Sequence, residues 1–276
     1  MVKKGKFNLF NFFNLLFAIC LVIFAIGPLI WMLFVSLRQE NEMFNTIWTL
    51  KHNFTLDNFK SIFSSGFLHS LKNSFIASIG STLISLIFGV PAAFALSQWT
   101  FRLKHQLSWL ILVLRMAPPI GFVIPFFLIA LNLQMIDNIF TLIIVYLILT
   151  LPLTIWLMWM FFSQLPESIL EASWIDGASV YRGFFSIAIP LSIPGIITSA
   201  ILSFSAAWND FFFALILTRS NSSTAPVAVS NFVTYSSTNW TGIASAAIIL
   251  ALPTIPMIFL MQKYLVQGIT GGAVKE

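Results

Sequence analysis

The sequence predicts an all-α integral membrane protein with six membrane-spanning helices. Of its 276 residues, 58% are hydrophobic and only 8% are charged, whereas a soluble domain carries about 25% charged residues. Disorder does not explain the missing charge, because disordered chains are poor in hydrophobic residues. Six stretches also reach the length of about 20 apolar residues that a helix needs to cross a bilayer.

The six predicted spans form a single transmembrane domain over residues 1–276. They cover residues 12–37, 71–98, 107–131, 139–162, 191–218 and 242–265. The first span follows three lysines, as the core of a signal peptide does. It is longer than the roughly 7–15 residues of such a core, and no small-residue cleavage site follows it. We therefore expect this span to be retained.

The second and fifth spans carry small residues at every fourth position. These residues are Ala77, Ser81, Ser85, Gly89, Ala93 and Ser97, followed in the fifth span by Gly195, Ser199, Ser203 and Ala207. Small residues at this spacing let two helix backbones approach closely in lipid. The pattern predicts helix packing, and the lining of a polar pathway is the alternative. Pro118 and Pro119 interrupt the third span, as prolines do in many transporters and in other membrane proteins.

The distribution of basic residues predicts that both termini are cytoplasmic. An even number of spans places the termini on one side, and cytoplasmic loops are enriched in Lys and Arg. With the termini inside, the inner segments hold Lys3, Lys4, Lys6, Arg102, Lys104, Arg182, Lys263 and Lys275. The outer segments hold fewer basic residues, namely Arg38, Lys51, Lys60, Lys72 and Arg219.

The connection over residues 163–190 is unusually long for a link between two spans. We expect a short helix from Ser168 to about Val180, with Pro166 near its start. Gly177 would end this helix or permit close backbone contact. Such an amphipathic element would project into the cytoplasm and fit a groove on another protein.

This connection resembles the EAA motif of ABC importer permeases, in which Glu-Ala-Ala is followed by Gly and then by Ile-x-Leu-Pro. The matching residues are Glu171, Ala172, Ser173, Gly177, Ile187, Ile189 and Pro190, and Asp176 beside Gly177 is also similar to the usual form. Ser173 stands for the second Ala, and Ile189 stands for Leu. The resemblance implies a coupling helix that docks into a cleft of a cytoplasmic ATPase. Glu171 would pair with a basic residue there, and Gly177 would allow the close fit.

The resemblance extends over most of the chain, to permeases of carbohydrate-uptake importers of the maltose-transporter type. The segments SFSAAWNDFFFALIL, TLDNFKSIF, RMAPP and VQGITGGAVKE are similar to the C-terminal-type permease of that group. This implies a type I ABC importer bundle in the lipid of a bacterial cytoplasmic (inner) membrane. The implied partners are a second homologous permease, an ATPase dimer, an extracytoplasmic sugar-binding protein and the sugar itself. ATP and Mg would bind to the ATPase, and this chain would hold no cofactor.

The same resemblance implies two further contacts. The outer loop, residues 219–241, is expected to be polar and flexible. It either reaches into the cleft of the binding protein or is an ordinary connection. The tail from Gly268 would touch the ATPase dimer.

Polar residues within the fifth predicted span form a second candidate site. A carboxylate near the bilayer centre costs about 2.5–3.5 kcal/mol, so Asp210 should face protein or water. Trp208, Asn209 and Asp210 either line the translocation pathway, with Trp208 stacking on a sugar, or Asp210 makes an interhelical contact that sets the bundle. Arg115 in the third span snorkels to the cytoplasmic interface, caps a carbonyl freed by proline, or contacts the substrate. Depth along the spans argues against a pair between Arg115 and Asp210.

Several patterns are missing from the sequence. It contains no G-x-x-x-x-G-K-[ST] phosphate-binding loop, no paired carboxylates or G-x-S-x-G elbow, and no His with metal-ligand spacing. We therefore expect a non-catalytic subunit. The lone Cys20 forms no disulfide framework, and the scattered basic residues form no nucleic-acid-binding stripe.

Three rival interpretations stay open. An ion-driven secondary transporter should show inverted repeats and intramembrane ion ligands, for which Asp210 is the sole acidic candidate. A membrane enzyme acting on lipid or polysaccharide should cluster polar residues at an interface. An ABC importer for another substrate class, such as an amino acid or an ion, keeps the architecture. The sugar itself, neutral or acidic, is not identified.

Overall fold

The computed structural model describes residues 9–40, 54–233 and 238–262. Within these ranges the chain is helical, and its β structure is limited to an isolated bridge between Val233 and Thr238. The contacts divide the chain into two compact units. Unit 1 contains residues 1–66 and 229–249, and unit 2 contains residues 67–228 and 250–276. The single-domain expectation stays a prediction.

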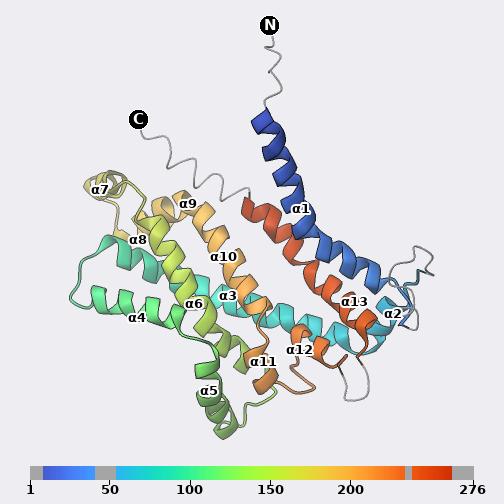
Figure 1. Ribbon diagram of the computed structural model, residues 1–276. Coiled ribbons are helices and arrows are strands. Elements are labelled where there is room, and N and C mark those ends of the chain that lie inside the picture. Colours follow the sequence, from blue (N-terminus) through green and yellow to red (C-terminus); the bar gives the residue numbers. More distant parts are fainter. Residues whose placement is uncertain (1–8, 41–53, 234–237, 263–276) are drawn as a thin grey trace. The chain divides into compact units, whose positions relative to one another are not determined.

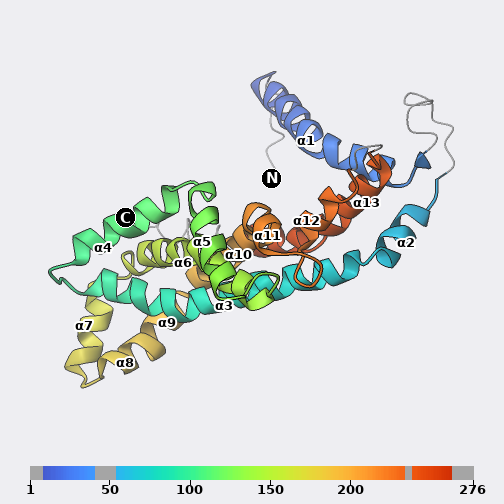
Figure 2. The ribbon, with the colours of Figure 1, turned by 90° about the horizontal axis from the view of Figure 1, so that it is seen from below.

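Three helices form the centre of unit 2: α3 (Phe67–Gln98), α6 (Ile139–Phe162) and α10 (Ile193–Trp208). They lie side by side and make the most extensive helix contacts in the described part of the chain (Figures 1 and 2). The small residues of α3 and α10 face these contacts and are buried, apart from the half-buried Ser97. The packing interpretation of the small-residue pattern is therefore confirmed.

Two glycines show how closely these helices approach one another. A Cβ atom on Gly89 would lie 2.9 Å from Cγ2 of Thr154, and one on Gly195 would lie 2.5 Å from the ring of Phe161. Hydroxyl pairs join the same helices. Ser85 Oγ lies 2.6 Å from Thr150 Oγ1, and Thr154 Oγ1 lies 2.8 Å from Ser203 Oγ. Such contacts hold helices together in lipid, where no hydrophobic effect operates between them.

Some predicted spans are broken. The third consists of α4 (Lys104–Met116) and α5 (Ile120–Asn132), which meet at 95°. Pro118 and Pro119 explain the break, because proline lacks the backbone donor and clashes with the preceding turn. Within the fifth predicted span, α10 ends at Trp208, and the chain becomes helical again as α11 (Phe212–Leu217). A second bend, of 74°, lies between Val180–Leu191 and Ile193–Trp208, where the chain enters α10. Four described helices are long and apolar enough to span a membrane, and up to six spans result if each of these two bent pairs is one span.

Unit 1 contains α1 (Leu9–Ser36), α2 (Asp57–Ser64) and most of α13 (Trp240–Ala251). The Asn58 amide donates to the carbonyls of Ser36 at 2.8 Å and Arg38 at 2.7 Å. Ser245 donates to the carbonyl of Ser36 at 3.2 Å. These bonds supply the end of α1 with donors that the helix itself lacks.

Several basic residues used for the topology prediction lie outside the described ranges, namely Lys3, Lys4, Lys6, Lys51, Lys263 and Lys275. The tail from Gly268 also lies outside them. The cytoplasmic location of the termini therefore stays a prediction.

Candidate coupling and translocation sites

The connection over residues 163–190 folds as several short helices at one end of unit 2 (Figure 1). They are α7 (Glu167–Ile175), α8 (Val180–Gly183), a π-helical turn (Phe184–Ala188) and α9 (Ile189–Leu191). The expectation of one helix from Ser168 to about Val180 is therefore wrong at its end. The chain turns after Ile175 and starts a second helix at Val180.

Gly177 causes this turn, as expected. Its φ of +82° lies in the left-handed region, which residues other than glycine rarely adopt. The N–H of Ala178 donates to the carbonyl of Ser173 at 2.9 Å, and the N–H of Gly177 donates to that of Trp174 at 3.0 Å. This pair of bonds is the Schellman motif that ends many helices. A Cβ atom here would meet nothing within 4 Å in the described chain, so the requirement for glycine is conformational.

Two of the described side chains of α7 are buried, and one of them packs the helix against the bundle. Leu170 is 2% exposed and packs in a cluster that includes Phe94, Phe162 and Phe184. Ser173 is also buried, and its hydroxyl donates to the carbonyl of Leu170 at 2.7 Å. The third position of the Glu-Ala-Ala pattern, where this chain has Ser173, is therefore a buried position with a small side chain.

The rest of the motif faces outward. Glu171, Ala172, Asp176, Gly177 and Pro190 are exposed, and Ile187 is half-buried. The sequence did not single out three large side chains beside them: Trp174, Ile175 and Tyr181, which are 37%, 86% and 78% exposed. Apolar residues between turn-forming residues in a short loop are the signal that points to them. Together they give the α7 end an apolar surface flanked by two carboxylates.

Asp210 lies in the break between α10 and α11 and is buried. Its carboxylate accepts the N–H of Ala214 at 3.2 Å and interacts with the hydroxyl of Tyr146 on α6. The first N–H groups of a helix have no partner within it, and water cannot supply one inside a bilayer. Asp210 therefore caps the resumed helix and joins it to α6. This geometry favours the bundle-setting alternative for Asp210.

Trp208 is also buried, at 2% exposure. Its indole N–H donates to the carbonyl of Leu250 at 3.2 Å. Its ring lies 4.7 Å from that of Phe75 and stacks on that of Phe204 at 5.4 Å. Asn209 is exposed, with its amide donating to the carbonyl of Ser205 at 2.8 Å. The sugar-stacking role of Trp208 stays a prediction, and in this conformation its ring is covered by protein.

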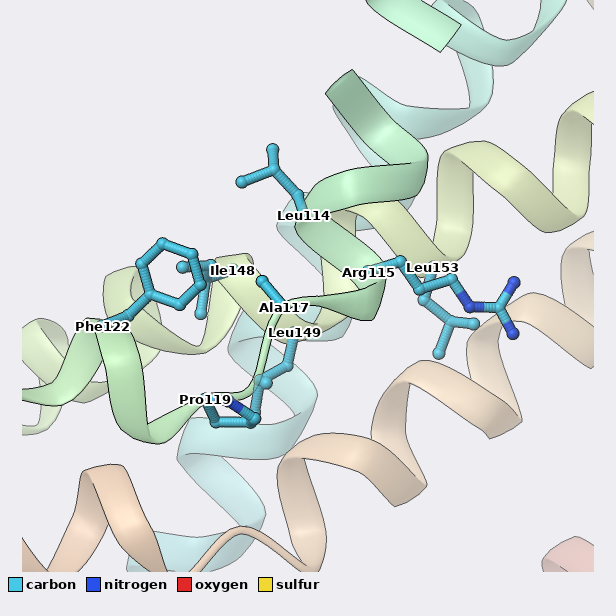
Figure 3. Close-up of a pocket in the computed structure, with 8 residues that line it drawn as sticks. All are labelled: Leu114, Arg115, Ala117, Pro119, Phe122, Ile148, Leu149 and Leu153. Atoms are coloured by element: carbon cyan, nitrogen blue, oxygen red, sulfur yellow. The ribbon is translucent and has the colours of Figure 1, made fainter. Parts of the chain in front are cut away.

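Arg115 lies at the bend between α4 and α5, beside a cavity of about 280 Å³. The other lining residues are Leu114, Ala117, Pro119, Phe122, Ile148, Leu149 and Leu153 (Figure 3). Figure 3 shows the guanidinium extending past Leu153, away from Phe122 and Ile148. Arg115 is exposed and makes no hydrogen bond or ion pair with a described residue. Among the described residues, Arg115 does not cap a carbonyl freed by proline. It also does not pair with Asp210, whose partners are Ala214 and Tyr146.

A third polar cluster, which the sequence did not indicate, surrounds Asp137 just before the first residue of α6. This end of unit 2, the Asp137 end, lies opposite the α7 end. The carboxylate of Asp137 accepts the backbone N–H groups of Arg219 at 2.8 Å and Asn221 at 3.1 Å. It also accepts the N–H of Ser222 at 2.9 Å and its hydroxyl at 2.8 Å. Burial raises the pKa of the Asp137 carboxyl, but these bonds outweigh burial and hold the pKa below its usual value.

The start of α3 binds the other side of the same loop. His69 contacts the carbonyl of Asn221 at 2.8 Å, and the Asn73 amide donates to the carbonyls of Asn221 and Ser223, each at 3.0 Å. The N–H of Ala225 donates to the Ser74 hydroxyl at 2.8 Å. The expected flexibility of residues 219–241 is therefore wrong for its first part, where side chains fix the backbone. The middle of this loop, residues 234–237, lies outside the described ranges.

Within the described ranges, no group of three or more His, Cys, Asp or Glu side chains is arranged to hold a metal ion. The polar side chains of the α7 end and of the Asp137 end instead bind backbone groups or face solvent.

Comparison with known proteins identifies the family of this chain. The family model for "binding-protein-dependent transport system inner membrane component" matches residues 85–271. The chain is 36% identical over 258 residues to a probable ABC transporter permease protein (y4oR) of Sinorhizobium fredii, covering 93% of each chain. It is 34% identical over 263 residues to the trehalose/maltose transport system permease protein MalG of Thermococcus litoralis, covering 94% of each.

A solved structure shares the fold. It is a crystal structure of a bacterial ABC transporter involved in the import of the acidic polysaccharide alginate, with a TM-score of 0.75 and 22% identity. The match covers 95% of this chain and 99% of that chain. The family model and the two relatives show that the chain belongs to the binding-protein-dependent transport system inner membrane components, the permeases of ABC transporters.

Proposed function

We propose that this chain is one permease subunit of an ATP-driven, binding-protein-dependent sugar importer of the bacterial cytoplasmic membrane. It forms half of the translocation pathway, and a second homologous permease forms the other half. The α7 end faces the cytoplasm, as do both termini. The Asp137 end faces outward, toward an extracytoplasmic sugar-binding protein.

The observation that carries this proposal is the construction of α7. The helix is anchored by Leu170, ended by Gly177 in the left-handed conformation, and exposed along Glu171, Ala172 and Asp176. Exposed apolar side chains beside these carboxylates, with Ile175 at 86%, are typical of an interaction site. The sequence of this element follows the EAA pattern, which supports docking into a cytoplasmic ATPase.

The proposed mechanism transmits a rigid-body movement. Two copies of the ATPase would bind ATP and Mg, and closure of their dimer would displace α7. Because α3, α6 and α10 pack with little free space around Gly89 and Gly195, the bundle would move with α7 rather than deform. Rocking against the second permease would switch the cavity between inward-open and outward-open states.

A sugar is the substrate class favoured by the relatives. The relative named for trehalose and maltose is 34% identical over nearly the full chain. Both are neutral disaccharides. The structure sharing the fold belongs to an importer of an acidic polysaccharide, and at 22% identity it supports the architecture alone. We therefore propose a sugar without assigning its charge or length.

The direct test is purification of the native complex through a tag on this chain, with partners identified by mass spectrometry. We expect a second permease, an ATPase with phosphate-binding motifs and a solute-binding protein to purify together with this chain. Isolation of the chain alone or as a homo-oligomer would favour the ion-driven transporter instead.

Coupling is tested with Glu171→Ala in the reconstituted complex. We expect normal expression and assembly but less sugar uptake per ATP hydrolysed, because the exposed Glu171 would no longer reach its basic partner. The matched control is Asp57→Ala, which removes an exposed carboxylate that binds Lys60 within α2. Normal uptake by the Glu171 variant at normal expression would sink the coupling assignment.

A further inference from the structure

A single carboxylate, that of Asp137, accepts three backbone N–H groups of the loop that follows α11. Asp137 has a φ of +61°, a conformation that Asp and Asn tolerate better than most residues. Its own N–H donates to the carbonyl of Leu217 at 2.9 Å. Its two carboxylate oxygens accept three backbone N–H groups of the loop, those of Arg219, Asn221 and Ser222. Asp137 therefore binds both the end of α11 and the turn beyond it.

Residues of α3 complete the clamp from the other side. The loop carbonyls of Asn221 and Ser223 accept from the side chains of His69 and Asn73. Below the turn, Ser222 and Thr224 are 2% and 1% exposed, and Ala225 is fully buried. The loop thus has a buried, hydrogen-bonded base on unit 2.

The tip of the same loop is open. Arg219, Ser220 and Asn221 are exposed. The Arg219 guanidinium donates to the carbonyls of Thr218 at 2.8 Å and Ile216 at 3.3 Å, so this cation is also held near one position. The clamp presents a short polar tip with one positive charge, at the end of unit 2 opposite α7.

A fixed tip matters for a transient docking partner. Ordering a loop on binding costs free energy that a preorganised loop has already lost on folding. A binding protein that docks and leaves in each transport cycle gains affinity from such a surface without adding contacts.

We propose that Asp137 is a positioning residue, which fixes residues 218–225 so that the tip Arg219–Asn221 is presented to the solute-binding protein in one conformation. This inference rests on the proposed function, because it requires a binding protein on the outer face. Asp137 does not touch that protein or the sugar.

Three substitutions separate the roles of Asp137. Asp137→Gly keeps the positive φ without strain and removes every side-chain acceptor. Asp137→Asn keeps one oxygen and the tolerated φ, but its amide group faces the N–H of Asn221. Asp137→Ala removes the acceptors and also strains the backbone. Asp57→Asn is the matched control, since its carboxylate binds Thr55 and Lys60 and lies in unit 1.

The experiment uses the assembled complex in nanodiscs, with the solute-binding protein that co-purifies with it, still carrying its own sugar. ATP hydrolysis is measured against the concentration of binding protein, and hydrogen exchange of residues 219–222 is measured in the same samples. For Asp137→Gly we expect faster exchange and a half-saturating concentration about tenfold higher, at an unchanged maximal rate. Asp137→Asn should lie between Gly and wild type, and Asp57→Asn should match wild type.

Each outcome decides the inference. If the glycine variant exchanges faster but keeps the wild-type half-saturating concentration, the order of the loop does not serve docking and the inference is overturned. It is also overturned if exchange does not change, or if the maximal rate falls while half-saturation is unaltered. If the wild-type complex is not stimulated by any binding protein, the proposed function itself fails.

Discussion

The two ends of unit 2 are held in place by different kinds of contact. The α7 end rests on apolar anchors such as Leu170, and it exposes large side chains such as Ile175 and Tyr181. The Asp137 end rests on hydrogen bonds from side chains to backbone, and it exposes a short polar loop. One end displays side chains for a partner to bury, whereas the other displays a backbone of fixed shape.

The difference indicates two kinds of docking. Burial of exposed apolar side chains favours a lasting contact, because interface affinity comes largely from such desolvated groups. A polar, preorganised loop suits a contact that forms and breaks repeatedly. The bundle of α3, α6 and α10 connects the two ends, so its rigidity determines whether one end responds to the other.

The largest expected effect comes from breaking this connection. Gly195→Ala would place a methyl group 2.5 Å from the ring of Phe161, and overpacking of this kind costs about 1–3 kcal/mol. We expect a lower melting temperature of the purified protein in detergent. The control is Gly121→Ala in α5, where the added methyl meets nothing within 4 Å. Equal melting temperatures for the two variants would contradict the tight packing of α10 on α6.

A smaller effect should separate the α7 end from a glycine outside unit 2. Gly177 and Gly66 both have a φ of +82°, and a methyl on either meets nothing within 4 Å. Alanine at each therefore carries a similar strain, about 1–2 kcal/mol. Gly177→Ala should lower sugar uptake per ATP hydrolysed, because it reshapes the end of α7, whereas Gly66→Ala should not. Uptake ratios measured in proteoliposomes that fall equally for both would mean that the effect is general strain.

The smallest effect is a pH dependence of the Asp137 end. The pKa of Asp137 is held below its usual value, so the ionised form favours the folded loop above the unfolded pKa. That stabilisation is lost only as the pH falls through the lowered pKa. A spin label on Ser220→Cys, in a Cys20→Ser background, should keep its mobility from about pH 8 to about pH 5 and loosen only below about pH 4. Loosening that begins already near pH 6 would contradict the lowered pKa of Asp137.

Much of the fold was predictable because periodic patterns depend on local physics. Residues 139–162 were expected as one span and form α6, since an apolar run of that length needs only the bilayer to define it. The four-residue repeat of small side chains also predicted correctly that α3 and α10 pack closely against other helices. The bends were not predictable in angle, because a proline frees backbone groups but neighbouring helices decide the direction of the kink.

The candidate sites were predictable in part. Gly177 could be identified because a helix end and a glycine coincide in the chain. Asp137 was missed because its partners lie more than 80 residues away, at Arg219 to Ser222. The cap that Asp210 provides was likewise hidden, since it depends on a helix break that no proline or glycine marks. Long-range side-chain-to-backbone bonds leave no periodic signal in one sequence.

In the proposed importer the α7 end, and not the Asp137 end, contacts the ATPase. The most direct test places a photo-cross-linking residue at Ile175, which is 86% exposed, or at the exposed Ser220, and irradiates the assembled complex. We expect an adduct with the ATPase from position 175 and none from position 220. An absent adduct at 175, or equal adducts from both positions, would contradict it.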